Sequence, residues 1–247
     1  MGLTLHYRLT APEGFAARRA AALVRRLHAT ASAWAAEGRI ERVLPISSER
    51  DDLDRFGSAW HALPHPDDPE TSVGVQIPPE AGWIFPIELG ADCEPLWLGL
   101  CRYPPTVAID GRNRSTRLSG RWQFTHFCKT QYASLHGWAH FVRCHGAAID
   151  LLGVGRGLGL HVKIDDEGGY WPHRDLAALR RHLDEMNGIV AALAGAVKDA
   201  TEDDGHAPVQ SPIFAHPQFE RLEAEGAART GASLVEATRI IARSTKR

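Results

Sequence analysis

The turn from Asp165 to Trp171 brings together more chemically capable side chains than any other short segment of the sequence. It reads Asp-Asp-Glu-Gly-Gly-Tyr-Trp, so three carboxylates precede two glycines and two aromatic rings. Glycine permits positive φ and close backbone approach, and aromatic rings beside polar groups are typical of small-ligand pockets. The competing interpretation is an ordinary acidic turn whose rings fill the core. We take as candidate ligand-binding residues Asp166, Glu167, Tyr170 and Trp171.

A second polar segment, Lys129-Thr130-Gln131, follows a stretch rich in aromatic residues. Lys129 could pair with Glu167 or attract a carboxylate or phosphate, so Lys129 and Gln131 join the candidate ligand-binding residues. Cys128 could act as a nucleophile only if a cationic neighbour lowered its pKa. No second acid or base supports that role, so a catalytic cysteine is the weaker interpretation.

Four carboxylates could together hold a divalent cation, which is the only cofactor that the sequence indicates. They are Asp92, Glu94, Asp166 and Glu167. Oxygen ligands of this kind suit hard ions such as Mg²⁺ and Ca²⁺. The corresponding function is a hydrolase-type enzyme in which His126 or Lys129 assists.

Histidine and cysteine also recur at regular spacings in the middle of the chain. His126 and Cys128 lie two residues apart, while His136, His140 and Cys144 follow at intervals of four. Zinc takes such ligands in tetrahedral sets, but no closely spaced pair anchors this set. Core histidines and inert thiols are the favoured interpretation, and a functional role for His126, Cys128, His140 and Cys144 stays open.

These candidates depend on a predicted strand–helix–strand–helix unit over about residues 122–198. Val162 and Ile164 alternate with polar neighbours, which is typical of a strand with one packed face. In the last helix, which Asp175 can cap, apolar residues recur at spacings of three and four. Their series is Leu176, Leu179, Leu183, Met186, Val190, Leu193 and Val197.

The connectivity of this unit predicts where the candidates lie. If both strands share one sheet, the helical connection makes them parallel, and their carboxyl ends lie at one edge. Ligands in open α/β sheets bind at such an edge. Lys129 would then lie on the same side as Glu167. An antiparallel strand from Leu96 to Tyr103 would begin there and add Asp92 and Glu94.

The rest of the chain completes a single predicted α+β domain over residues 1–200. It contains a strand–helix–strand unit over 1–47 and central strands over 72–128. Between them we expect a short helix through Leu53, Phe56 and Trp60. Asp110-Gly111 predicts a tight hairpin turn.

Residues 201–247 form a predicted linker and helical tail. A polar, proline-containing stretch precedes a helix at 217–225 and a capping box, Ser233 to Glu236. The apolar residues of this tail are too few for a core of their own. We therefore expect the tail to pack on the main domain or on a second copy of the chain, as a homodimer.

Composition excludes several classes of function. The formal net charge of the 247 residues is −2, which gives no electrostatic case for binding nucleic acid or a membrane surface. No apolar run reaches transmembrane length, and the N-terminus does not resemble a signal peptide. The four cysteines include no C-x-x-C pair, which fits reduced thiols in a cytoplasmic protein.

The sequence thus predicts an α+β protein with a mixed sheet, helices mainly on one face and a helical C-terminal tail. The leading functional hypothesis is a binding module for a small polar ligand or a protein partner, at the sheet edge near Lys129 and Glu167. The divalent-cation-dependent hydrolase is the alternative.

Overall fold

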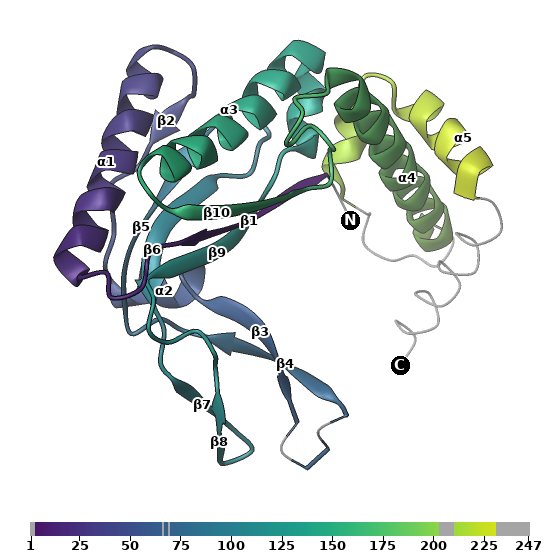
Figure 1. Cartoon of the computed structure of the whole chain (residues 1–247). Helices are drawn as coiled ribbons and strands as arrows, with labels where there is room; N and C mark the ends of the chain where they lie inside the picture. Colours follow the sequence, from purple (N-terminus) through teal and green to yellow (C-terminus); the bar gives the residue numbers. More distant parts are fainter. Residues whose placement is uncertain (1–2, 66, 69, 203–209, 231–247) are drawn as a thin grey trace. The chain divides into compact units, whose positions relative to one another are not determined.

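Alternating buried and exposed residues build the central sheet of the protein. The computed structural model describes residues 3–65, 67–68, 70–202 and 210–230 (Figure 1). In β1 (Thr4–Thr10), Tyr7 and Leu9 are buried while His6 and Arg8 are exposed. This period of two puts one side of the strand against the core.

Six strands form this sheet, in the order β10-β1-β9-β6-β5-β2. The pairs β2–β5, β5–β6 and β6–β9 are antiparallel. The remaining strands of the sheet are β2 (Arg42–Val43), β5 (Ala81–Glu88), β6 (Leu96–Arg102), β9 (Gln123–Lys129) and β10 (His161–Asp166). This mixed sheet, together with the helices of the chain, gives the α+β fold that the sequence predicts.

The strands β9 and β10 run in the same direction, with β1 between them. The N–H groups of Thr130 and Glu167 donate to the carbonyls of Leu3 and Thr4, so both strands end where β1 begins. The N–H of Ala11 donates to Trp122 at the other end of β9. The predicted common direction of the two strands is therefore confirmed.

Two long helices cover one face of the sheet. They are α1 (Ala17–Ala36) and α3 (Trp138–Gly157), and Figure 1 shows both on the same side of it. Between the layers, Leu27, Phe85 and Ile149 are almost completely buried. Burial of such apolar side chains is the main favourable term in folding.

Two antiparallel hairpins and a short helix lie outside the sheet. One hairpin pairs β3 (Ala59–Pro64) with β4 (Ser72–Ile77), and the other pairs β7 (Thr106–Ile109) with β8 (Arg112–Ser115). The predicted turn at Asp110-Gly111 joins β7 to β8, with φ values of 48° and 76°. Positive φ at both central residues fits a type I′ hairpin.

The short helix α2 (Arg50–Phe56) ends earlier than the sequence suggests. The predicted continuation to Trp60 is wrong, because Trp60 lies in β3. The helix stops at Gly57, whose carbonyl accepts a 2.7 Å hydrogen bond from the buried Tyr103 hydroxyl. A β-carbon at Gly57 would lie 2.7 Å from the Leu53 carbonyl oxygen, so only glycine avoids a clash where the chain leaves the helix.

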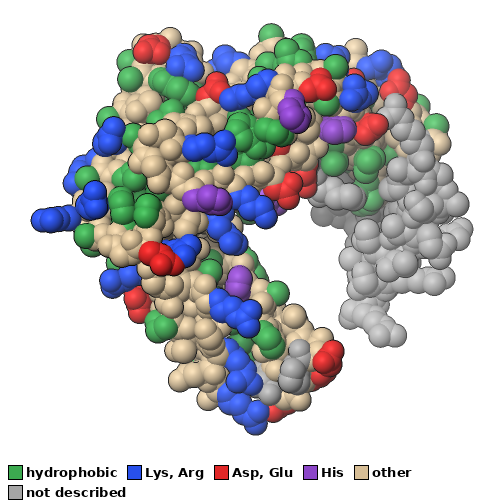
Figure 2. Space-filling view, in the orientation of Figure 1, with side chains coloured by type: hydrophobic (Ala, Val, Ile, Leu, Met, Phe, Trp, Pro, Cys, Tyr) green, Lys and Arg blue, Asp and Glu red, His purple; other side chains and the backbone are tan. Residues whose placement is uncertain are grey.

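The described chain forms two compact units. The sheet unit comprises residues 6–128 and 142–165, and the helical unit comprises 3–5, 129–141, 166–202 and 210–230. The single domain over residues 1–200 stays a prediction. Figure 2 shows Lys and Arg side chains interspersed with carboxylates on the face in view. None of the helices within the described ranges is both long and apolar enough to cross a bilayer.

The helical unit is built around α4 (Leu176–Glu202) and α5 (Phe219–Thr230). It also contains the 3₁₀ helices η1 (Gln131–His136) and η2 (Pro212–Ala215). Gly188 of α4 and Gly226 of α5 allow close approach, since a β-carbon on Gly226 would lie 1.9 Å from the Gly188 carbonyl oxygen. Most of the predicted apolar face of α4 is at least half-buried, but Leu176 is 47% exposed. The helix predicted at 217–225 packs on α4, and the capping box at Ser233–Glu236 lies outside the described residues.

Candidate functional site

A cavity of about 650 Å³ lies in the sheet unit beside strands β6 and β9. Within the described part of the chain, these strands share one registered pair, Cys101 opposite Gln123. Further along, the Tyr7 hydroxyl donates a 2.6 Å hydrogen bond to the Trp97 carbonyl. This phenol belongs to β1. It provides the Trp97 carbonyl with the hydrogen bond that an N–H group of β9 would donate if the ladder between β6 and β9 were continuous.

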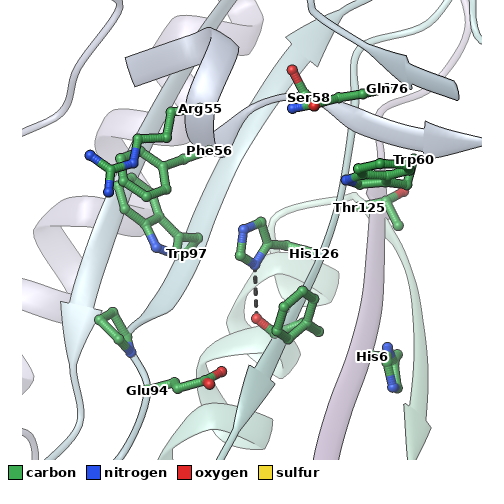
Figure 3. Close-up of a pocket in the computed structure, with 12 residues that line it drawn as sticks. His6, Arg55, Phe56, Ser58, Trp60, Gln76, Glu94, Trp97, Thr125 and His126 are labelled. Carbon is green, nitrogen blue, oxygen red and sulfur yellow. Dashed lines mark hydrogen bonds between the residues drawn. The ribbon is translucent and has the colours of Figure 1, made fainter. Parts of the chain in front are cut away.

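Four aromatic residues line much of the cavity: Phe56, Trp60, Trp97 and Phe127. Figure 3 shows Phe56 and Trp97 on one side and Trp60 on the other, with His126 between them. The polar residues of the lining are His6, Arg55, Ser58, Gln76, Glu94, Thr125 and His126. An apolar wall with a few polar groups is the composition expected of a small-molecule site.

The first wall is a ring stack that α2 holds in place. Phe56 stacks on Trp97 with ring centroids 4.1 Å apart and planes 15° from parallel. The Arg55 guanidinium lies 5.0 Å from the Phe56 centroid, within the range of a cation–π interaction. Arg50 anchors the start of the helix by donating to the Pro79 carbonyl at 2.6 Å. The stack is therefore fixed from both ends of a short helix.

The second wall comes from the β3–β4 hairpin. Trp60 and Gln76 are cross-strand partners, so their side chains stand on the same face of the hairpin. Trp60 is 72% exposed, and Phe127, which also lines the cavity, is 47% exposed. Exposed rings that gather around one cavity, as these two do, are typical of an interaction site.

His126 supplies a hydrogen-bond acceptor to the cavity. Its Nδ1 lies 2.8 Å from the Phe127 carbonyl oxygen, and a carbonyl can only accept, so we assign the proton to Nδ1. Burial lowers the pKa of His126, which favours the neutral ring. In that tautomer Nε2 is an acceptor. The Glu94 carboxylate adds a second acceptor to the lining.

The structure places the predicted acidic turn in the helical unit, where its carboxylates bond to the backbone. Asp166 Oδ1 accepts from Gly168 N–H at 2.8 Å, and Oδ2 accepts from Tyr170 and Trp171 N–H at 2.8 and 2.9 Å. Glu167 Oε2 accepts from Thr4 N–H at 2.8 Å. These bonds give both carboxylates a role in shaping the turn and anchoring the first strand.

The other predicted ligand-binding residues also belong to the helical unit. Gln131 is buried, accepts from Leu3 N–H at 3.0 Å and donates to Asn187 Oδ1 at 2.8 Å. Lys129 is half-buried at the end of β9. The Arg174 guanidinium lies 5.2 Å from the Tyr170 ring and 6.0 Å from that of Trp171.

The four predicted metal ligands are divided between the two units. Asp166 and Glu167 belong to the helical unit, whereas Asp92 and Glu94 follow β5 in the sheet unit. In the residues that the structure describes, no three His, Cys, Asp or Glu side chains are grouped so as to hold a metal ion. The geometry therefore adds no support to the divalent-cation hypothesis.

The His and Cys candidates are also divided. Cys128 and Cys144 are buried in the sheet unit, and His126 lines its cavity. His136 and His140 are ring neighbours in the helical unit, with centroids 5.0 Å apart.

Most residues of the cavity are not among those that the sequence predicts. Phe56, Trp97 and Phe127 are absent from the predicted site, and Trp60 is predicted in a helix. The only clue to Trp60 in the sequence is weak. It follows Gly57-Ser58, a pair that can end a helix, and an aromatic residue just after such a chain reversal has little core to pack into. Comparison of this chain with protein-family models, curated proteins and solved structures finds no match.

Proposed function

We propose that this protein is a binding module for a small molecule that carries a flat ring and N–H donors. The observation that carries the proposal is the cavity in the sheet unit, whose walls are the Phe56–Trp97 stack and the exposed Trp60. A flat ring can contact these aromatic faces over a large area. His126 Nε2 and the Glu94 carboxylate would accept hydrogen bonds from the ligand.

This proposal keeps the binding function expected from the sequence but prefers another location. At the predicted edge, the Asp166 and Glu167 carboxylates already bond backbone N–H groups, and both ends of the Gln131 amide are engaged. A ligand there would have to replace these bonds, and buried groups left unpaired are costly. Stacking on the rings of the aromatic cavity demands no such exchange.

Indole, adenine and N-methylindole are suitable first probes, with binding measured by ligand-observed NMR. Indole and adenine offer flat rings with N–H groups, and N-methylindole is the matched control that lacks the N–H. We expect N-methylindole to bind roughly threefold to tenfold more weakly than indole, as the loss of one hydrogen bond predicts.

Two tryptophan variants locate the site. Trp60→Ala should weaken probe binding about tenfold or more, because stacking on an aromatic side chain is worth about 1–3 kcal/mol. Trp34→Ala removes a tryptophan of α1 that does not line the cavity, and probe binding should persist. Equal losses in the two variants would place the probes elsewhere. Failure of all flat probes at millimolar concentration would contradict the small-molecule proposal and favour a protein partner.

We further propose a cytoplasmic protein whose C-terminal tail could join two copies. The proposal rests on the sequence, whose cysteines have no C-x-x-C spacing and whose tail has too few apolar residues for its own core. Size-exclusion chromatography with light scattering, before and after truncation at about residue 200, tests the homodimer. A monomer at all concentrations of the full chain would exclude it.

A further inference from the structure

Three of the four cysteines form a cluster in the sheet unit. Cys93 lies in the connection between β5 and β6, Cys128 in β9 and Cys144 in α3. The Cys93 thiol lies beside the thiols of Cys128 and Cys144 and interacts electrostatically with both. Cys93 is half-buried, and the other two are fully buried. Three thiols from distant parts of the chain therefore meet, and Cys93 is the least buried of the three residues.

The same thiols hold the ends of the β5–β6 connection. Cys144 Sγ donates to the Leu89 carbonyl at 3.7 Å, and Cys128 Sγ donates to the Glu94 carbonyl at 3.2 Å. Cys93 lies between these two anchor points. Glu94 is in turn part of the cavity lining. The Cys128 thiol is thus bonded to a residue of the cavity wall.

We propose that Cys93 and Cys128 form a reversible disulfide, which makes this cluster a thiol–disulfide exchange site. The partner in exchange is a low-molecular-weight disulfide. Cys93 thiolate attacks one sulfur of that disulfide and releases one thiolate, which leaves a mixed disulfide on Cys93. Cys128 thiolate then attacks the Cys93 sulfur and releases the second thiolate. Both protein thiols lose a proton, two external thiols form, and the electrons balance.

Exposure and contacts decide the order and the pairing. Cys93 is the half-buried thiol, so an external disulfide reaches it first. Cys128 is favoured over Cys144 as the second thiol because its Sγ already lies beside the adjoining peptide, 3.2 Å from the Glu94 oxygen. Cys144 contacts the far end of the connection, at a longer distance. Cys101 is not part of the cluster, and burial raises its pKa to about 12.

Oxidised glutathione, applied to the folded full-length protein, tests the proposal. The interaction with Cys128, together with burial, holds the pKa of Cys93 well above its ordinary value. The reaction is therefore run at about pH 8.5, where more thiolate is present. Remaining thiols are alkylated after unfolding, and the protein is digested with trypsin. The peptides of interest are 56–102, 122–129 and 144–156, which carry Cys93 with Cys101, Cys128 and Cys144.

The proposal predicts a disulfide between peptides 56–102 and 122–129. The link should persist in Cys101→Ala and Cys144→Ala, which are the matched controls, and disappear in Cys93→Ser. Fragmentation of the wild-type peptide between Cys93 and Cys101 gives the same assignment should a variant fold poorly. A dominant link from Cys93 to peptide 144–156, or four alkylated thiols after oxidation, would overturn the proposal. Because the link is read by mass, its failure is distinct from any failure of probe binding.

Discussion

The Tyr7 hydroxyl of β1 donates to the Trp97 carbonyl of β6, past the intervening strand β9. Counting four residues along each strand from the Cys101–Gln123 pair would place Phe127 opposite Trp97 in a continuous ladder. Instead a phenol from the neighbouring strand reaches the Trp97 carbonyl, and the Phe127 ring lines the cavity. Burial raises the pKa of Tyr7 well above its ordinary value, so the hydroxyl stays a donor.

Tyr7→Phe removes this hydrogen bond while keeping the ring. We expect the free energy of unfolding to fall by about 1–2 kcal/mol, because the Trp97 carbonyl loses its donor. Urea denaturation measures the change, and Tyr132→Phe in the helical unit serves as the reference for removing a phenol hydroxyl. A loss no larger than that of the reference would show that water replaces the phenol without cost.

Gly82→Ala should destabilise the sheet unit. A β-carbon at Gly82 would lie 2.6 Å from Cys101 Sγ and 3.2 Å from the Leu100 carbonyl oxygen, so the buried Cys101 side chain or its strand has to shift. Overpacking of this kind costs about 1–3 kcal/mol. The matched control is Gly146→Ala in α3, where nothing lies within 4 Å. That substitution should stabilise by about 0.5–1 kcal/mol, so the two variants should move the urea midpoint in opposite directions.

The sequence was sufficient for elements whose pattern is local. Val162 alternates with polar neighbours and Leu179 repeats at helical spacing, so β10 and α4 follow from period alone. Asp110-Gly111 likewise identifies its own turn. Connectivity then gave the common direction of β9 and β10, although it does not reveal the intervening β1.

The candidate site was not predictable in the same way. The cavity is lined by residues of β6, β9, α2 and the β3–β4 hairpin, so it depends on the packing of elements remote in sequence. The sequence favours a helix for Trp60, since no local signal indicates that β3 pairs with β4. In the sequence, Asp166 looks like a ligand-binding residue, because the sequence does not show that three backbone N–H groups donate to its carboxylate.

Asp166→Ala tests the structural role of the acidic turn. Three backbone N–H groups lose their acceptor, so we expect a loss of about 2–3 kcal/mol in the free energy of unfolding. Asp166→Asn keeps one acceptor oxygen, so its free energy of unfolding should lie between those of Asp166→Ala and the wild type. The exposed neighbour in Asp165→Ala is the control and should change stability by less than about 0.5 kcal/mol. A stable Asp166→Ala protein would contradict the structural role and return Asp166 to the ligand-binding candidates.

Acidification should destabilise the protein through His126. Burial is the main cause that lowers the pKa of His126 in the folded state below its ordinary value of 6.5. The unfolded chain therefore binds a proton more readily, and stability falls as pH drops from 6.5 toward the folded-state pKa. Well above pH 6.5, where both states are deprotonated, the contribution of His126 no longer changes with pH.

Thermal unfolding of wild type and His126→Gln between about pH 7.5 and 5 measures this contribution. The melting temperature of the wild type should fall more steeply with acid than that of the variant. Probe binding should weaken over the same range, since protonation converts Nε2 from an acceptor into a donor. Parallel melting curves for the two proteins would mean that His126 does not sense pH.

The walls of the cavity are held in place by the protein itself, and this affects how a ligand binds. The Phe56–Trp97 stack and the paired β3–β4 hairpin are held by contacts within the protein, so the walls do not depend on a ligand. In such a preorganised site the protein loses little conformational entropy on binding, so most of the entropy loss falls on the ligand. The backbone should then move by less than about 1 Å on complex formation, and selectivity should follow the shape of the ring more than its charge.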